Sequence, residues 1–214
     1  MATYTSRYPR TRRRTDDMVR KVRSIIDDAG INYLSITGRA KSPASFSDKV
    51  ARRASELGHT DFDPALDITD QVGVRIITYV HSDIEPVAQL LAENFTVLED
   101  RDMGRETASE GRFGYASRHM LISNDPSATA YDAAQCMSVQ LRTVLQHAWA
   151  EFEHDARYKG DVPAEFAHEL DRRFTLAAGL IELADREFSV IRDTLSSGLS
   201  QQGEGRFEDG LRVD

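Results

Sequence analysis

Cationic side chains gather between residues 39 and 53 of this 214-residue chain, at a spacing that suits a polyphosphate. Arg39 and Lys41 alternate at the end of an expected strand, so both side chains point to one side. Lys49 and Arg53 lie four residues apart on the expected helix that follows, and therefore share one face. Cations beside a helix N-terminus attract phosphate through their charge and through backbone N–H groups. A basic helix face turned to solvent is the alternative interpretation of this pattern.

Asp70 and Arg75 stand at the most strongly apolar segment of the chain, VGVRIITYV. Asp70 comes just before this segment, and Arg75 lies inside it. An arginine among apolar residues must face a cleft or find a partner, because a buried unpaired charge is costly. Two structural alternatives explain the pair about equally well. In those alternatives Asp70 forms a turn or cap at the start of the strand, and Arg75 forms a salt bridge at the edge of the sheet.

Two further segments carry polar side chains that could take part in chemistry. Tyr115 follows a glycine-containing stretch and could stack on a base, although on the pattern alone an ordinary aromatic at the start of a strand explains it better. Alternation places Ser138, Gln140 and Arg142 on one face of a strand, opposite the apolar residues between them. The following segment HAWAEFEH lacks the H-E-x-x-H arrangement, which excludes a zinc-peptidase site.

The hydrophobic pattern predicts the elements that must position these side chains. Helices are expected at residues 15–29, 42–58, 83–95, 144–158 and 164–194. Strands are expected at residues 31–38, 72–80, 96–103, 115–123 and 136–143. The polar stretch at residues 104–114 is expected to be a mobile loop. The sum is an α+β (mixed α/β) fold, in which helices flank a mixed sheet of about five strands.

These elements predict one domain with appendages. The arginine-rich residues 1–14 are expected to be a disordered basic N-terminus. Residues 15–160 are expected to form the domain itself, and residues 161–195 a C-terminal helical extension. The polar residues 196–214 are expected to be a disordered tail.

The composition is typical of a globular protein, with 40% apolar and 29% charged residues. A single cysteine, Cys136, excludes a disulfide framework and a thiolate zinc site. No apolar run approaches the roughly 18 residues that a membrane helix needs. The N-terminus lacks the apolar stretch of a secretory signal, so we expect a cytoplasmic location.

Charge is distributed unevenly along the chain, which carries a net charge of −8. Residues 1–60 hold 13 Lys or Arg and 6 Asp or Glu. Residues 61–214 hold 14 Lys or Arg and 29 Asp or Glu. A basic first quarter on an acidic body indicates a local anion site and argues against a broad nucleic-acid surface.

Four blocks, in this order, resemble the RelA/SpoT-type synthetase domain of the enzymes that make guanosine tetraphosphate and related alarmones. The blocks are TGRAKSPASFSDKVARR, DITDQVGVRII, FGYASRHMLI and QLRTVLQHAWAEFEHDARYK, within about residues 36–160. Each block is weak alone, whereas four in the same order are specific. The few residues before the first block favour a small stand-alone alarmone synthetase over the long members with a hydrolase domain. The helix at 164–194 resembles one through which some small members oligomerise, so a homodimer or homotetramer is expected.

The resemblance implies a nucleotidyltransferase-like fold and a pyrophosphokinase activity. The β,γ-pyrophosphate of ATP would pass to the 3′-hydroxyl of GDP, GTP or GMP, and AMP would leave. Positioning and charge neutralisation do most of the work in such transfers.

The resemblance also implies a role for each matched residue. The implied ATP ligands are Arg39 and Arg75 on the adenine, and Lys41, Ser45, Lys49 and Arg52 on the phosphates. The implied ligand of Mg²⁺ is Asp70, and the implied catalytic positions are Asp70, Ser138, Gln140 and Arg142. The implied acceptor-nucleotide positions are Tyr115, His119, His154 and Lys159, with Tyr115 stacked on the guanine.

Ser138 is the main departure from the family pattern, because the family reads E-I-Q-I-R-T where this chain reads S-V-Q-L-R-T. The resemblance assigns the missing glutamate to Mg²⁺ and to activation of the 3′-hydroxyl. Serine is neither an anionic ligand nor a base near neutral pH, and loss of a general base costs ~10²–10⁴-fold in rate. Glu151 or Glu153 is a candidate substitute.

Two other interpretations therefore stay open. One is a catalytically impaired relative that binds a nucleotide or a partner protein. The other is a toxin-type relative that pyrophosphorylates tRNA, against which the acidic body argues, because tRNA affinity depends on phosphate neutralisation.

Overall fold

A computed structural model describes residues 2–57, 62–109, 117–159 and 164–208. Its five strands are β1 (Tyr33–Ala40), β2 (Val72–Thr78), β3 (Thr96–Asp102), β4 (Arg118–Ser123) and β5 (Cys136–Thr143). Its α-helices are α1 (Ala2–Asp28), α2 (Pro43–Leu57), α3 (Pro64–Asp67), α4 (Ile84–Asn94), α5 (Met103–Ser109), α6 (Val144–Lys159) and α7 (Ala164–Glu208). A 3₁₀ turn, η1 (His81–Asp83), precedes α4. The predicted α+β class and the mixed five-stranded sheet are confirmed.

The strands form one sheet in the order β1-β2-β5-β4-β3. The central strands β2 and β5 run parallel, and every other neighbouring pair runs antiparallel. The parallel register sets Gly73 beside Ser138 and Arg75 beside Gln140. The sheet thereby joins two of the sequence blocks that carry candidate site residues.

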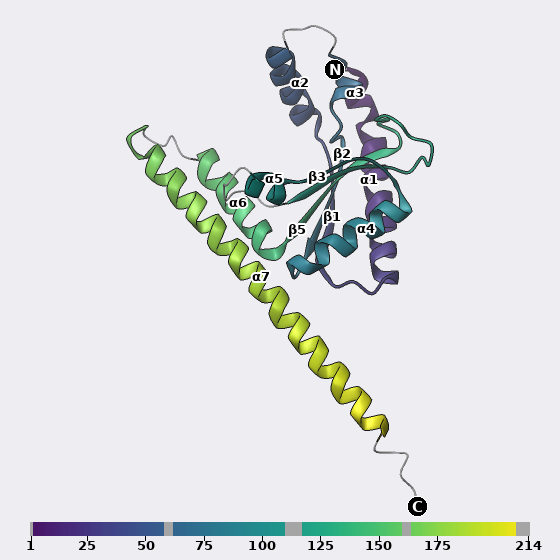
Figure 1. The fold of residues 1–214 in the computed structure, drawn as a ribbon. Coiled ribbons are helices and arrows are strands. Elements are labelled where there is room, and N and C mark those ends of the chain that lie inside the picture. The colour runs from purple at the N-terminus through teal and green to yellow at the C-terminus, as the bar shows by residue number, and fades with distance from the viewer. Residues whose placement is uncertain (1, 58–61, 110–116, 160–163, 209–214) are drawn as a thin grey trace, which may run out of the picture.

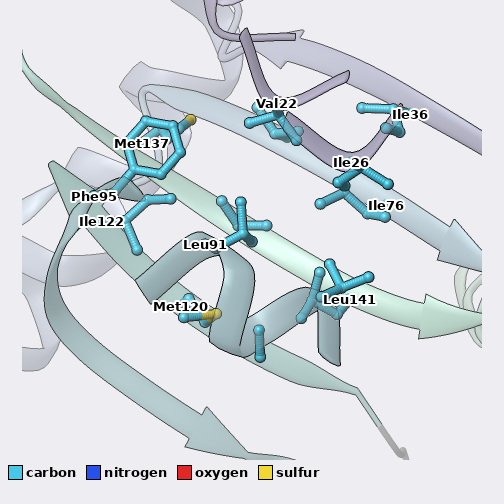
Figure 2. Packing of buried hydrophobic residues seen from close by; sticks show 14 of the residues in the cluster. Val22, Ile26, Ile36, Ile76, Leu91, Phe95, Met120, Ile122, Met137 and Leu141 are labelled. Atoms are coloured by element: carbon cyan, nitrogen blue, oxygen red, sulfur yellow. The ribbon is translucent and has the colours of Figure 1, made fainter. Parts of the chain in front are cut away.

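The hydrophobic core lies between one face of the sheet and helices α1 and α4, which cover that face (Figures 1 and 2). Met18, Val22 and Ile26 of α1 are buried there, as the apolar face of the predicted helix requires. Each central strand contributes every second residue: Val72, Val74 and Ile76 from β2, and Met137, Val139 and Leu141 from β5. Because side chains alternate across a strand, the residues between these point to the other face.

The expectation of a disordered N-terminus at residues 1–14 is wrong, because α1 begins at Ala2. Tyr4 is buried and stacks on Phe46 of α2, with 3.9 Å between the ring centroids. Its hydroxyl donates a hydrogen bond of 2.7 Å to the backbone oxygen of Lys41. Arg14 donates to the backbone oxygens of Ala133 and Cys136. A few tertiary contacts therefore hold a segment whose composition alone predicts disorder.

Two other expectations need correction. Part of the segment predicted to be a loop is the helix α5, and Asp102 accepts a hydrogen bond from the backbone N–H of Arg105 in its first turn. Residues 110–114 of that segment lie outside the described residues. The tail predicted at 196–214 is also shorter, because α7 continues to Glu208.

Helix α7 packs against the domain over part of its length and then extends away from it (Figure 1). Its Phe174 meets Trp149 of α6, with 5.6 Å between the ring centroids. Farther along, the buried Asp185 accepts a 2.6 Å hydrogen bond from Thr143, the last residue of β5. Among the described residues, no helix combines the length and apolarity that crossing a membrane requires.

Gly38 of β1 lies where α1 packs closely against the sheet. A Cβ atom at this position would lie 2.6 Å from Cγ2 of Thr15 and 2.7 Å from Cγ2 of Val19. We expect Gly38→Ala to lower the free energy of unfolding by about 1–3 kcal/mol, as overpacking typically does. Urea denaturation would measure the change. Gly73→Ala is the control, because the nearest atom to its added Cβ is 3.4 Å away. Equal stability of the two variants would contradict the close packing.

Candidate functional site

A cavity of about 660 Å³ lies on the face of the sheet opposite the core. Its lining comes mainly from the alternate residues of β1, β2, β4 and β5 that point away from α1 and α4. It brings together nine of the predicted site residues: Arg39, Lys41, Lys49, Asp70, Arg75, His119, Ser138, Gln140 and Arg142. Each of the four sequence blocks therefore contributes at least one residue to the cavity.

Asp70 is held between two lysines at one end of the cavity. Its Oδ2 lies 2.7 Å from Nζ of Lys41, and its Oδ1 lies 2.9 Å from Nζ of Lys49. Burial alone would raise the pKa of Asp70, but the two hydrogen bonds and charges outweigh it and hold the pKa below the ordinary value. The carboxylate therefore stays ionised, and both of its oxygens are engaged by ammonium groups.

Arg75, Gln140 and His119 form a hydrogen-bonded line across β2, β5 and β4. Nε of Arg75 donates to Oε1 of Gln140 at 3.3 Å, and Nε2 of Gln140 lies 3.1 Å from Nε2 of His119. Oγ of the buried Ser117 lies 2.7 Å from the same His119 nitrogen. Burial and the nearby Arg101 cation lower the pKa of His119. The ring is therefore neutral near pH 7.

Arg142 is the most deeply buried cation of the cavity, with only 5% of its surface exposed. Burial, reinforced by the charge of Arg75, lowers the pKa of Arg142 to about 10. It is still protonated near pH 7. NH1 of Arg75 also lies 3.0 Å from Oε1 of Glu151 on α6. The clustered cations give the cavity a positive potential, which favours a polyanionic ligand.

Several predicted site residues lie elsewhere. Ser45 is in the first turn of α2, where its backbone N–H donates to Oγ of Ser42 at 3.1 Å. The Arg52 side chain is exposed, and its Nε lies 3.9 Å from Oε1 of Glu56. The neighbouring Arg53 lines the cavity instead. His154 is exposed on α6 and is not part of the lining. Tyr115 and the side chain of Lys159 lie outside the described residues.

The cavity also contains residues that the sequence reasoning missed. They include Thr37 and Thr69, and two charged residues of β3, Glu99 and Arg101. Alternation along the segment LEDRD places Glu99 and Arg101 on one face, so this signal was present in the sequence. The pairing of β3 with β4 is what places these two side chains on the cavity side of the sheet.

Comparisons with known proteins show what the chain is similar to. A family model described as the region found in RelA/SpoT proteins matches residues 38–162. The GTP pyrophosphokinase YjbM of Bacillus subtilis (strain 168) is 29% identical over 161 residues, which are 73% of this chain and 71% of YjbM.

Solved structures match over most of the chain. A GTP pyrophosphokinase family protein from Streptococcus pneumoniae has a TM-score of 0.72 at 23% identity, and the match covers 92% of this chain and 97% of that one. The small alarmone synthetase 1 of Bacillus subtilis, bound to its product pppGpp, has a TM-score of 0.70 at 22% identity. That match covers 92% of this chain and 100% of the other. At these identities the structural likeness supports the fold.

The lysine pair at Asp70 predicts a specific titration. In the wild type, NMR of the Asp70 carboxyl carbon should give a pKa below 3.8, because the two ammonium groups favour the ionised form. Lys49→Gln removes one of them, so the pKa should rise. The two ion pairs of Asp70 also make the stability of the fold depend on pH. Their stabilisation is fully present above the pKa that Asp70 has in the unfolded chain, and it is lost as the pH falls through the lower pKa that Asp70 has in the folded protein. An unchanged pKa in Lys49→Gln would contradict the predicted role of Lys49.

Proposed function

The chain belongs to the RelA/SpoT family, and on that premise we propose that it is a small alarmone synthetase. It transfers the β,γ-pyrophosphate of ATP to the 3′-hydroxyl of GDP, GTP or GMP and releases AMP. The products are the alarmones of the stringent response. The observation that carries this proposal is the meeting of cations from separate sequence blocks in one cavity beside Asp70.

The ATP side of the cavity supplies both contacts that the reaction needs. Arg39 and Arg75 take the adenine between their guanidinium planes, since planar cations stack well on aromatic faces. Lys41 and Lys49 turn from Asp70 to the phosphates, because a polyphosphate offers them more negative charge than one carboxylate. Arg53, which lines the cavity, is better placed for the phosphates than the exposed Arg52.

The donor set around Asp70 fits a magnesium ion that is held jointly with a nucleotide. Mg²⁺ prefers oxygen ligands and is usually bound by one or two carboxylates together with substrate phosphates. Among the described residues, no group of three or more His, Cys, Asp or Glu side chains could hold a metal by itself. Asp70 supplies the carboxylate of this set. When bound, Mg²⁺ neutralises phosphate charge and makes the transferred phosphorus a better electrophile.

The remaining polar residues of the cavity orient the reacting groups. Arg142, deeply buried and protonated, faces the negative charge that develops on the transferred pyrophosphate. The neutral His119, held by Ser117 and Gln140, offers a fixed hydrogen-bonding partner to the acceptor nucleotide. Tyr115 stacks on the guanine.

A second candidate function follows from Ser138, which lines the cavity where the family carries a glutamate. Without a second carboxylate in reach, the chain would bind ATP and turn it over poorly or not at all. An impaired relative of this kind would still act through nucleotide or partner binding. A direct rate measurement separates the two functions.

We also propose that the protein is a cytoplasmic homo-oligomer, assembled through α7. This helix exposes a row of large apolar side chains at helical spacing: Leu176, Leu180, Leu183, Val190, Ile191 and Leu195. Such a row is stabilised when a second apolar surface covers it. A second copy of the chain would present the same row. The cytoplasm is the compartment in which ATP and guanosine nucleotides are both supplied.

The proposed function is tested by incubating the purified protein with γ-labelled ATP, Mg²⁺ and GMP, GDP or GTP in turn, and separating the nucleotides. We expect a labelled guanosine product together with AMP. Asp70→Asn is the matched negative control, because it keeps the shape of the side chain and removes its charge. ATP binding without product from any acceptor would favour the impaired relative.

The adenine clamp predicts a loss of ATP affinity. Arg39→Ala and Arg75→Ala should each weaken binding by about 0.5–2 kcal/mol, the usual range of a cation–π contact. Calorimetric titration with a non-hydrolysable ATP analogue would measure the change. Arg173→Ala serves as the control, because this arginine lies on the exposed face of α7 and pairs with Glu169. Wild-type affinity in both clamp variants would remove the proposed contact.

The apolar row predicts the effect of charge on assembly. In light-scattering chromatography the wild type should have a mass of two or four chains. Leu180→Lys together with Ile191→Lys should reduce this mass to that of a single chain, because a buried unpaired ammonium is costly. The circular dichroism spectrum should be unchanged, since both side chains are more than half exposed in one chain. A monomeric wild type would contradict the proposal.

A further inference from the structure

The proposed transfer needs a group that accepts the proton of the acceptor 3′-hydroxyl, and Ser138 cannot do so near neutral pH. Resting on the proposed function, we propose that Glu99 of β3 supplies the missing base from two strands away. It lies on the cavity wall and points to the same face of the sheet as Ser138. Position 138 does not need the glutamate that the family carries there if a carboxylate from another strand reaches the place that its side chain would occupy.

The register of the sheet places Glu99 in one row with Ser138. Glu99 pairs with Leu121 on β4, and Leu121 pairs with Ser138 on β5. Neighbouring strands lie about 4.8 Å apart, so the two Cα atoms are separated by roughly 10 Å. A glutamate carboxylate extends about 5 Å from its own Cα. Two side chains of glutamate length, one from position 99 and one from position 138, would together span this distance above Leu121.

The cavity leaves Glu99 available for this role. The carboxylates among its described lining residues are Asp70 and Glu99. Under the proposed function Asp70 is a ligand of Mg²⁺, and a carboxylate that is bound to a cation is a poor base. Glu99 makes no hydrogen bond and no ion pair with the described residues, although the charge of Arg101 and the ring of His119 lie close enough to interact with it. Glu99 is thus an exposed carboxylate on the wall of the cavity.

Glu151 is a weaker candidate for the same role. Its Oε1 is 3.0 Å from NH1 of Arg75, and Nδ1 of His147 is 3.6 Å away. It lies on α6 and is not part of the cavity lining. A carboxylate that is paired with the proposed adenine clamp is expected to position Arg75. Loss of Glu151 should therefore affect ATP binding more than the chemical step.

The proposed step is balanced as follows. Glu99 takes the proton as the O3′–H bond breaks, and O3′ forms a bond to the β-phosphorus of ATP. The bond between that phosphorus and the α,β-bridging oxygen breaks, and AMP leaves with this oxygen and its electron pair. Glu99 afterwards releases the proton to solvent. No oxidant, reductant or further reactant is required.

The test compares kcat and KM for the wild type, Glu99→Gln, Glu151→Gln and Glu93→Gln. We expect Glu99→Gln to lower kcat by ~10²–10⁴-fold, the usual cost of losing a general base, with little change in KM for ATP. In the same variant, the fall of kcat at low pH that the wild type shows should disappear. Glu151→Gln should mainly raise KM for ATP. Glu93→Gln, on the exposed side of α4, should match the wild type.

Rescue is the decisive measurement. The double variant Glu99→Gln/Ser138→Glu should have a kcat at least ten-fold above that of Glu99→Gln, because it again has a carboxylate beside the acceptor 3′-hydroxyl. Thermal unfolding of each variant checks that the loss is not a folding defect; a folded Glu99→Gln with wild-type kcat would overturn the proposal. The proposal would also be overturned if Glu151→Gln lost kcat and Glu99→Gln did not.

The proposal and the function on which it rests fail differently. If Ser138→Glu forms product while the wild type does not, the alarmone-synthetase chemistry stands and the role of Glu99 is overturned. If neither protein forms product with any guanosine acceptor, the proposed function fails as well.

Discussion

The alternation of side chains across the five-stranded sheet is the constraint on which the rest of the structure depends. Helices α1 and α4 bury one set of alternate residues, and this burial fixes which residues face the opposite side. A one-residue slip in either central strand would exchange the buried valines for Arg75 or Gln140. The hydrophobic core and the cavity are therefore two consequences of a single register. Neither can change without the other.

Charge is concentrated where that register exposes it. The described lining of the cavity includes seven cationic side chains and two carboxylates, although the whole chain carries a net charge of −8. Asp70 and Glu151 neutralise some of these cations in the structure, through Lys41, Lys49 and Arg75. Under the proposed function, a polyphosphate would replace these carboxylates and bring more charge to the same partners. The cavity is thus organised for an anion before one is bound.

Tertiary contacts decide the order of the two ends of the chain. The arginine-rich start of α1 has few apolar residues, yet Tyr4 stacks on Phe46 and fixes it beside the segment that carries Lys41. At the other end, Asp185 and Arg192 tie α7 to the end of β5 and to η1. Both attachments depend on one or two side chains, which composition and periodicity do not reveal. They also place helices against the strands that form the cavity.

The sequence alone determined the α+β class, the strands β2 and β5 with their buried alternate residues, and the family, because periodicity and ordered motifs are local properties. It also identified nine of the residues that meet in the cavity. Their functional roles stay predictions. Only the tertiary structure decided that Arg53 replaces Arg52 in the lining, since helix phase relative to the sheet is set by packing. It alone brought Glu99 into one row with Ser138, because strand order is a long-range property that no local pattern encodes.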